Sequence, residues 1–76
     1  MREMEIKVKD EIKEEFGKFM LHLLTELPAR NIKCVTNGSL FFLPLPEGID
    51  VNLVKERIIQ RYGSKVNIKI VEKGKT

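Results

Sequence analysis

The sequence has very few of the residues that build disulfides and metal sites. Cys34 is the only cysteine and His22 the only histidine among 76 residues. A disulfide within the chain is therefore impossible, and one chain cannot assemble the Cys and His ligands of a structural zinc site. A core of this size supplies only about 3–5 kcal/mol, so small domains usually need further stabilisation. With disulfides and metals excluded, we expect the chain to self-associate.

The sequence also lacks a long apolar segment. Its longest apolar run, from Leu40 to Leu45, is as long as a strand and far shorter than the ~20 residues of a membrane-spanning helix. The first residues, from Met1 to Glu5, are charged, and no apolar stretch typical of a secretory signal follows them. We expect a cytoplasmic protein without membrane contact.

The groups that carry most enzyme chemistry are equally scarce. Nucleophilic catalysis requires an activated Ser, Cys or Thr beside a positioned base. Cys34 is expected among core side chains, where burial raises the pKa of a thiol instead of activating it. His22 falls on the polar side of a predicted helix, with no second His or Cys nearby. We predict no catalytic residues, no metal and no cofactor; an enzyme whose active site is completed between two subunits stays an alternative.

Apolar residues at spacings of three and four predict two helices, over about 12–27 and 51–62. Asp10 and Asp50 precede these segments, and each is expected to accept a hydrogen bond from the first turn of its helix. A proline ends the first helix, and Gly63 is expected to end the second in the left-handed conformation. The first helix carries more acidic residues and the second more basic ones, so we expect the two to attract each other.

Four short segments have the pattern of strands. Apolar and polar residues alternate over 4–8 and 66–70, as in strands with one buried face. Between the helices, two further strands are predicted over 31–36 and 39–43. They flank Asn37-Gly38, a dipeptide that favours a two-residue hairpin loop. The second of these strands is expected to end at Pro44, because a proline has no N–H for the ladder.

An Asn37-Gly38 loop sets the register of the hairpin. It predicts that Thr36 lies opposite Ser39 and Ile32 opposite Leu43 at the two ends, with three pairs between them: Val35 with Leu40, Cys34 with Phe41, and Lys33 with Phe42. Opposed residues share a face of the sheet. We therefore expect Cys34 and Phe41 to face the helices, and the other two pairs to face away from them.

The order β-α-β-β-α-β predicts an α+β two-layer sandwich of the ferredoxin-like plan, with an antiparallel sheet of order 4-1-3-2. Right-handed crossovers place both helices on one face. We expect a single domain over 1–76, ordered over about 3–72, with 73–76 as a flexible tail.

The sheet face opposite the helices is the predicted functional surface. Such a face is normally polar, whereas here apolar residues are expected among lysines, a composition typical of interaction sites. The predicted interaction face consists of Lys7, Lys33, Val35, Leu40, Phe42 and Lys69. We predict a small non-enzymatic binding or regulatory module that forms a homodimer, or binds a protein partner, through this face or a sheet edge.

Two other interpretations of this face are open. In the first, Phe42 stacks on a base of single-stranded RNA while the surrounding lysines bind phosphates. In the second, Leu40 and Phe42 only fill a central strand that is apolar on both sides, and lysine stems cover them. The sequence does not identify a partner or a ligand.

Overall fold

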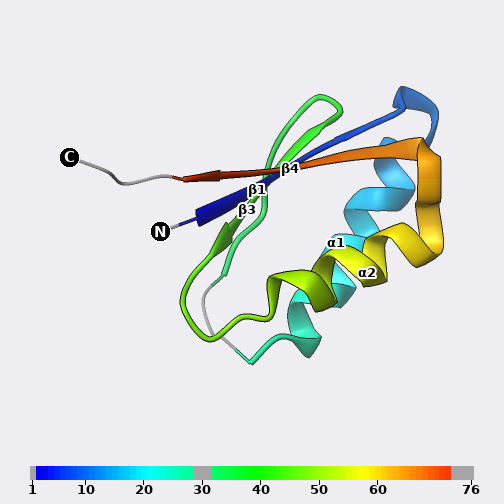
Figure 1. Ribbon diagram of the computed structural model, residues 1–76. Helices are drawn as coiled ribbons and strands as arrows, with labels where there is room; N and C mark the ends of the chain where they lie inside the picture. Colours follow the sequence, from blue (N-terminus) through cyan, green and yellow to red (C-terminus); the bar gives the residue numbers. More distant parts are fainter. Residues whose placement is uncertain (1, 29–31, 73–76) are drawn as a thin grey trace.

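The computed structural model describes residues 2–28 and 32–72 of the chain. These residues form two layers, a four-stranded sheet and two helices that both lie on one of its faces (Figure 1). In chain order, the elements are β1 (Arg2–Val8), α1 (Lys13–Glu26), β2 (Val35–Asn37), β3 (Leu40–Leu45), α2 (Val51–Tyr62) and β4 (Val66–Glu72). Two short 3-10 helices, Asp10–Ile12 and Gly63–Lys65, precede α1 and follow α2.

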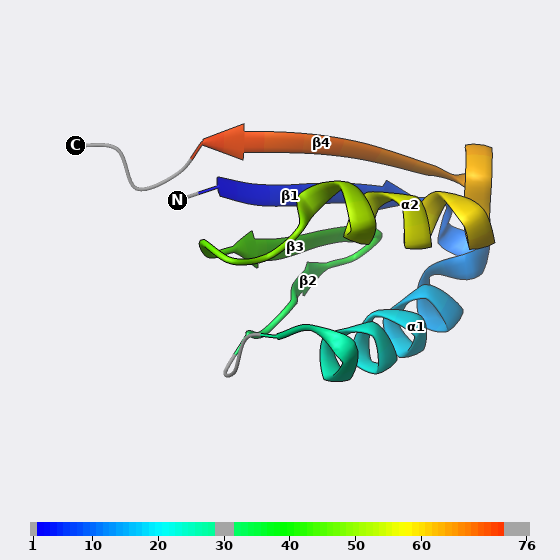
Figure 2. The same ribbon diagram turned by 60° about the horizontal axis from the view of Figure 1, so that its bottom comes forward.

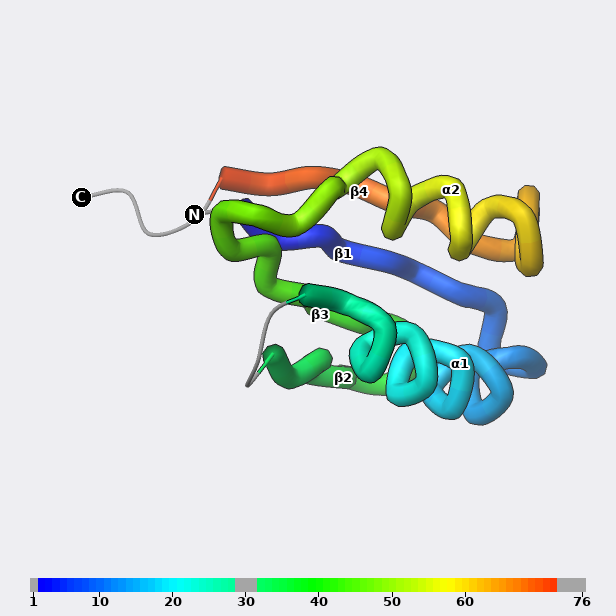
Figure 3. Tube along the Cα trace, turned by 90° about the horizontal axis from the view of Figure 1, so that it is seen from below, coloured from blue at the N-terminus to red at the C-terminus, as the bar shows by residue number. Residues whose placement is uncertain are grey.

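The sheet is antiparallel and has the order β2-β3-β1-β4, which is the predicted order 4-1-3-2 read from the other edge. The strands can be followed from β4 to β2 in Figure 2. Seen from the helical side, α2 lies over β4 and β1, and α1 lies beside β2 and β3 (Figure 3). The predicted α+β ferredoxin-like sandwich is therefore confirmed. The predicted tail, 73–76, lies outside the described residues.

The core forms between the sheet and the helices around Phe16 of α1. The ring centroid of Phe16 lies 4.8 Å from that of Phe41 in β3 and 5.2 Å from that of Tyr62 in α2, both edge-on. Each such pair contributes about 0.5–1.5 kcal/mol beyond the burial of its area. The other buried side chains are Met4, Ile6, Val8, Ile12, Met20, Leu23, Leu43, Leu45, Ile49, Val54 and Ile58. One aromatic ring thus connects both helices to the sheet.

The two predicted N-caps have different outcomes. Asp50 caps α2, because its carboxylate oxygen Oδ1 accepts a hydrogen bond of 3.1 Å from the backbone N–H of Leu53. The prediction for Asp10 is wrong: the chain makes a 3-10 turn before α1, Asp10 belongs to that turn, and no side chain caps either segment. The end of α1 is as predicted, with Leu27 in an extended conformation before Pro28.

The end of α2 differs in detail from the prediction. Gly63 has a positive φ of 55°, as predicted, but its ψ of −124° lies outside the left-handed helical region. Its N–H still donates to the carbonyl oxygen of Ile59, and the chain continues into the short 3-10 helix before β4. A residue with a side chain would be strained at this φ, so glycine is required here.

Opposite charges join the two helices. Arg57 Nη1 lies 2.6 Å from Glu26 Oε1, and Arg61 Nη2 lies 3.9 Å from Glu15 Oε2. The hydrogen bond from Arg57 holds the pKa of Glu26 below its ordinary value. Exposed ion pairs of this kind contribute little to stability. The predicted attraction between the helices is confirmed, and it accounts for part of the uneven charge along the chain.

The hairpin between β2 and β3 has a different register from the predicted one. Its observed pairs are Asn37 with Leu40, Thr36 with Phe41, and Val35 with Phe42. The loop therefore consists of Gly38 and Ser39 instead of Asn37 and Gly38. Gly38 has a φ of 63°. A glycine at the first position of a two-residue loop is typical of one of the two turn types that hairpins favour.

The shift in register leaves the faces of the hairpin unchanged. Val35 was expected opposite Leu40 and lies opposite Phe42, two residues further along the same strand. Because alternate residues of a strand share a face, a shift of two keeps every side chain on its predicted side. Lys33 is the exception: β2 begins only at Val35, so Lys33 precedes the strand and the predicted pair with Phe42 is wrong.

The prediction that β3 ends at Pro44 is also wrong, since the strand continues to Leu45. Pro44 lies opposite Glu3 of β1, while β2 reaches only as far as Phe42. On the side away from β1, this part of β3 is therefore an edge that needs no N–H donor, and a proline is tolerated there. The extension places Leu45 in the core.

We expect Asp50→Ala to lower the free energy of unfolding by about 1 kcal/mol, because the N–H of Leu53 loses its acceptor. Asp50→Asn should keep most of the stability, because the amide oxygen can accept the same bond. Urea unfolding followed by circular dichroism measures both. Asp10→Ala is the matched control and should change stability by less than about 0.5 kcal/mol; equal losses at Asp10 and Asp50 would contradict the capping scheme.

Candidate interaction surface

Two rows of side chains cross all four strands on the sheet face opposite the helices, which we name the open face. From β2 to β4, the first row contains Val35, Phe42, Glu5 and Lys69. The second row contains Asn37, Leu40, Lys7 and Asn67. Residues opposed in this way have Cβ atoms about 5 Å apart. Five of the six predicted interaction residues therefore come together, and Lys33 does not belong to either row.

The apolar residues of the open face gather at its β2–β3 end. We name Val35, Leu40 and Phe42 the apolar patch. The side chain of Val35 is 60% exposed, and those of Leu40 and Phe42 are half-buried. Both helices lie on the other side of the sheet (Figure 1), so neither of them covers the patch.

The open face carries charges of both signs. Lysines were expected around the patch, and of these Lys7 lies beside Leu40 in the second row. Glu5 lies directly between Phe42 and Lys69 in the first row. A carboxylate beside Phe42, the aromatic residue of these two rows, repels a phosphate backbone.

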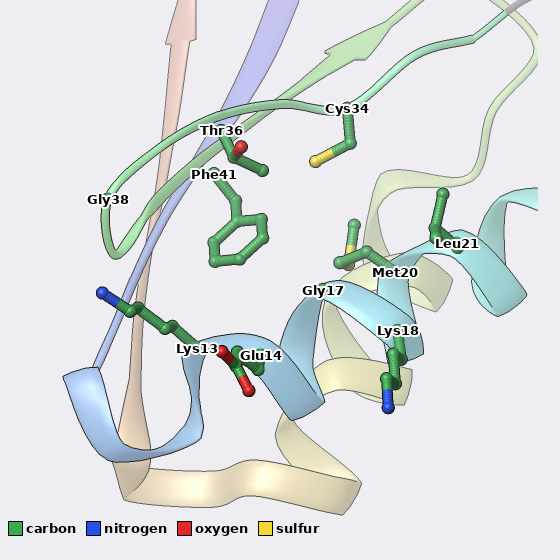
Figure 4. Close-up of a pocket in the computed structure, with 10 residues that line it drawn as sticks. All are labelled: Lys13, Glu14, Gly17, Lys18, Met20, Leu21, Cys34, Thr36, Gly38 and Phe41. Carbon is green, nitrogen blue, oxygen red and sulfur yellow. The ribbon is translucent and has the colours of Figure 1, made fainter.

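A concave surface lies between α1 and the hairpin, and the sequence did not predict it. It is a cavity of about 530 Å³. Its apolar lining comes from Gly17, Met20, Leu21, Cys34 and Phe41, and Lys13, Glu14, Lys18, Thr36 and Gly38 also line it. Figure 4 shows the ring of Phe41 and the thiol of Cys34 on the hairpin side and Met20 on the helix side. The sequence signal that could have predicted the cavity is Leu21, an apolar residue outside the apolar stripe of α1. In the structure Leu21 is 68% exposed.

Cys34 is the one thiol that lines this cavity, and its surroundings suppress its reactivity. Burial raises the pKa of the Cys34 thiol to about 11, and the backbone of Phe42 only partly offsets this effect. A thiol with this pKa is almost entirely protonated near neutral pH, and only the thiolate is a good nucleophile. The predicted packing of Cys34 toward the core is confirmed, since it contacts the buried cluster.

The remaining titratable groups do not form a reactive cluster. His22 is exposed on α1, as predicted. The hydroxyl of Tyr62 donates to Glu15 Oε2 over 3.4 Å, and burial raises the pKa of Tyr62. Within 2–28 and 32–72, no three His, Cys, Asp or Glu side chains are grouped so that they could hold a metal ion. In the same part of the chain, no helix has the length and apolar character of a membrane span.

The fold and this surface define a small α+β domain with one face of its sheet uncovered. Comparison of the chain with protein-family models, curated proteins and solved structures found no match. The functional proposal therefore depends on the geometry of the chain itself.

We expect alkylation of Cys34 in the folded protein to accelerate with pH around a midpoint near 11, because burial disfavours the thiolate. Urea-unfolded protein is the control, with a midpoint near 9.0. Between these values the folded state binds the proton more tightly than the unfolded state, so this group makes the free energy of unfolding fall as pH rises. A folded-state midpoint near that of unfolded protein would contradict the burial of the thiol.

Proposed function

We propose that this chain is a small non-enzymatic binding module that self-associates through the open face of its sheet. The observation that carries the proposal is the apolar patch of Val35, Leu40 and Phe42, which neither helix covers. Uncovered apolar patches with polar rims are typical of protein interaction sites. A domain this small, with a single cysteine, also gains stability from association that its own core supplies only sparingly.

The charges beside the patch support a second copy as the partner. Glu5 and Lys7 lie two residues apart on the same face of β1, and Lys69 lies next to Glu5 on β4. Because a two-fold axis brings the same surface of both copies together, Glu5 of one copy can approach Lys7 or Lys69 of the other. The open faces of two copies are therefore complementary in charge.

The non-enzymatic part of the proposal is supported by the environment of the possible catalytic groups. Burial raises the pKa of the half-buried Cys34 thiol, and His22 is exposed on α1. General acid–base or nucleophilic catalysis requires a nucleophile, a base and an orienting group in contact. The described residues bring no such set together.

We expect Phe42→Lys to lower the mean mass that light scattering reports at tens of micromolar, relative to wild type, because a buried ammonium in the contact would lose its hydration. Leu21→Lys is the control: Leu21 is an exposed apolar residue on α1, away from the open face, and its substitution should leave the mass unchanged. Circular dichroism verifies folding of both. Equal masses for wild type and Phe42→Lys would rule out the open face as a contact.

A further inference from the structure

The outer edge of β4 is an unprotected strand edge. β4 pairs with β1 without interruption, from Val66 opposite Val8 to Glu72 opposite Arg2. Figure 2 shows β4 as the outermost strand, and no described residue pairs with its other side. Soluble proteins usually blunt such edges with prolines, bulges or several charges. β4 has no proline and no bulge, and Lys69 is the one lysine along it.

The apolar side of β4 is only partly buried within the chain. Val66, Ile68 and Ile70 point to the helix side of the sheet, where they pack against the core without being enclosed. The residues opposite them on β1, such as Ile6 and Met4, are fully buried. The row of β-branched side chains at the edge therefore has room for a further apolar neighbour.

One residue of α2 extends this apolar edge. Ile59 is 47% exposed, and it lies two positions from both Arg57 and Arg61, which face α1 through their ion pairs. Two positions on a helix correspond to a rotation of about 200°, so Ile59 faces away from α1. Since α2 lies over β4 and β1 (Figure 3), that side of the helix is the β4 edge.

We propose that a second copy of the chain pairs with this edge, β4 antiparallel to β4, with Ile68 on the two-fold axis. Ile68 then lies opposite itself, Val66 opposite Ile70, and Asn67 opposite Lys69 of the second copy. β-Branched pairs form on the helix side and a neutral–cationic pair on the open side. This contact uses a surface separate from the apolar patch, and it goes beyond the proposed function.

The charges and the length of β4 select this register over its neighbours. With Lys69 on the axis, two lysines would oppose each other, and like charges directly opposed destabilise a strand pair. With Asn67 on the axis, the pairing would extend only from Val66 to Ile68, because Lys65 lies in the 3-10 helix before β4. The register centred on Ile68 avoids opposed lysines and pairs β4 from Val66 to Ile70.

The pairing joins two four-stranded sheets into one continuous sheet. The two-fold axis is normal to this sheet, so both copies keep their helices on the same side and the two α2 helices flank the seam. Both apolar patches then lie on the other side of the joined sheet. The pairing supplies hydrogen-bond partners for both β4 edges and encloses the half-buried apolar row.

Single cysteines along β4, each in a Cys34→Ala background, test the register. Ile68→Cys should form an intermolecular disulfide on mild oxidation, because opposed Cα atoms lie about 4.5–5.5 Å apart. Asn67→Cys and Lys69→Cys are matched controls and should not crosslink, because their like residues would be separated by more than the bond can span. Preferential crosslinking at either control position, or none at any position, would overturn the proposal.

A charge series tests the same contact without oxidation. Asn67→Glu should tighten dimerisation about tenfold, because two symmetry-related pairs with Lys69 form, and Asn67→Lys should weaken it by a similar factor. Adding Lys69→Glu to Asn67→Lys should restore it. Analytical ultracentrifugation reports each constant. The same series in a Phe42→Lys background tests the edge contact without the contact through the open face. If this background is monomeric at every concentration, the edge pairing is overturned, whether or not the open face forms a contact in wild type.

Discussion

Two helices can cover only one face of a four-stranded sheet, and the rest of this structure depends on that limit. β1 shows it most directly, since Met4 and Ile6 are buried beneath the helices while Glu5 and Lys7 face the other way. Phe16 completes the covered side, where its ring contacts Phe41 of β3 and Tyr62 of α2. Burial of this one face supplies the main stabilisation of the domain. Everything proposed for function concerns the surfaces that the helices leave uncovered.

Those surfaces are of two kinds, and they offer different physical interactions. The open face presents side chains, with the apolar patch at one end and charges of both signs beside it. The β4 edge presents backbone N–H and C=O groups together with a half-buried row of β-branched residues. A face contact depends on shape and charge, whereas an edge contact is specified by strand register. Because the two surfaces are separate, a domain of 76 residues can use both at once.

The polar groups around the core contribute little to stability and show no reactive arrangement. The Arg57–Glu26 and Arg61–Glu15 pairs lie between the helices at the surface, where ion pairs contribute little stability. Cys34 lines the cavity between α1 and the hairpin, and burial raises the pKa of its thiol. β2 is only three residues long and covers little of α1. The cavity lies between the sheet and α1, on the side opposite the open face.

The sequence alone determined which side chains face the helices, because alternation along a strand and spacing along a helix are local properties. Together with the handedness of crossovers and the preference of Asp for N-caps, these patterns predicted the sheet order, the Asp50 cap and five of the six residues of the open face. The tertiary structure decided where segments begin, end and pair. The hairpin turns at Gly38-Ser39, β3 continues past Pro44 because β1 extends beside it and β2 does not, and Lys33 stays outside the sheet. The cavity likewise depends on contacts between α1 and the hairpin, which are distant in the chain and which no local pattern specifies.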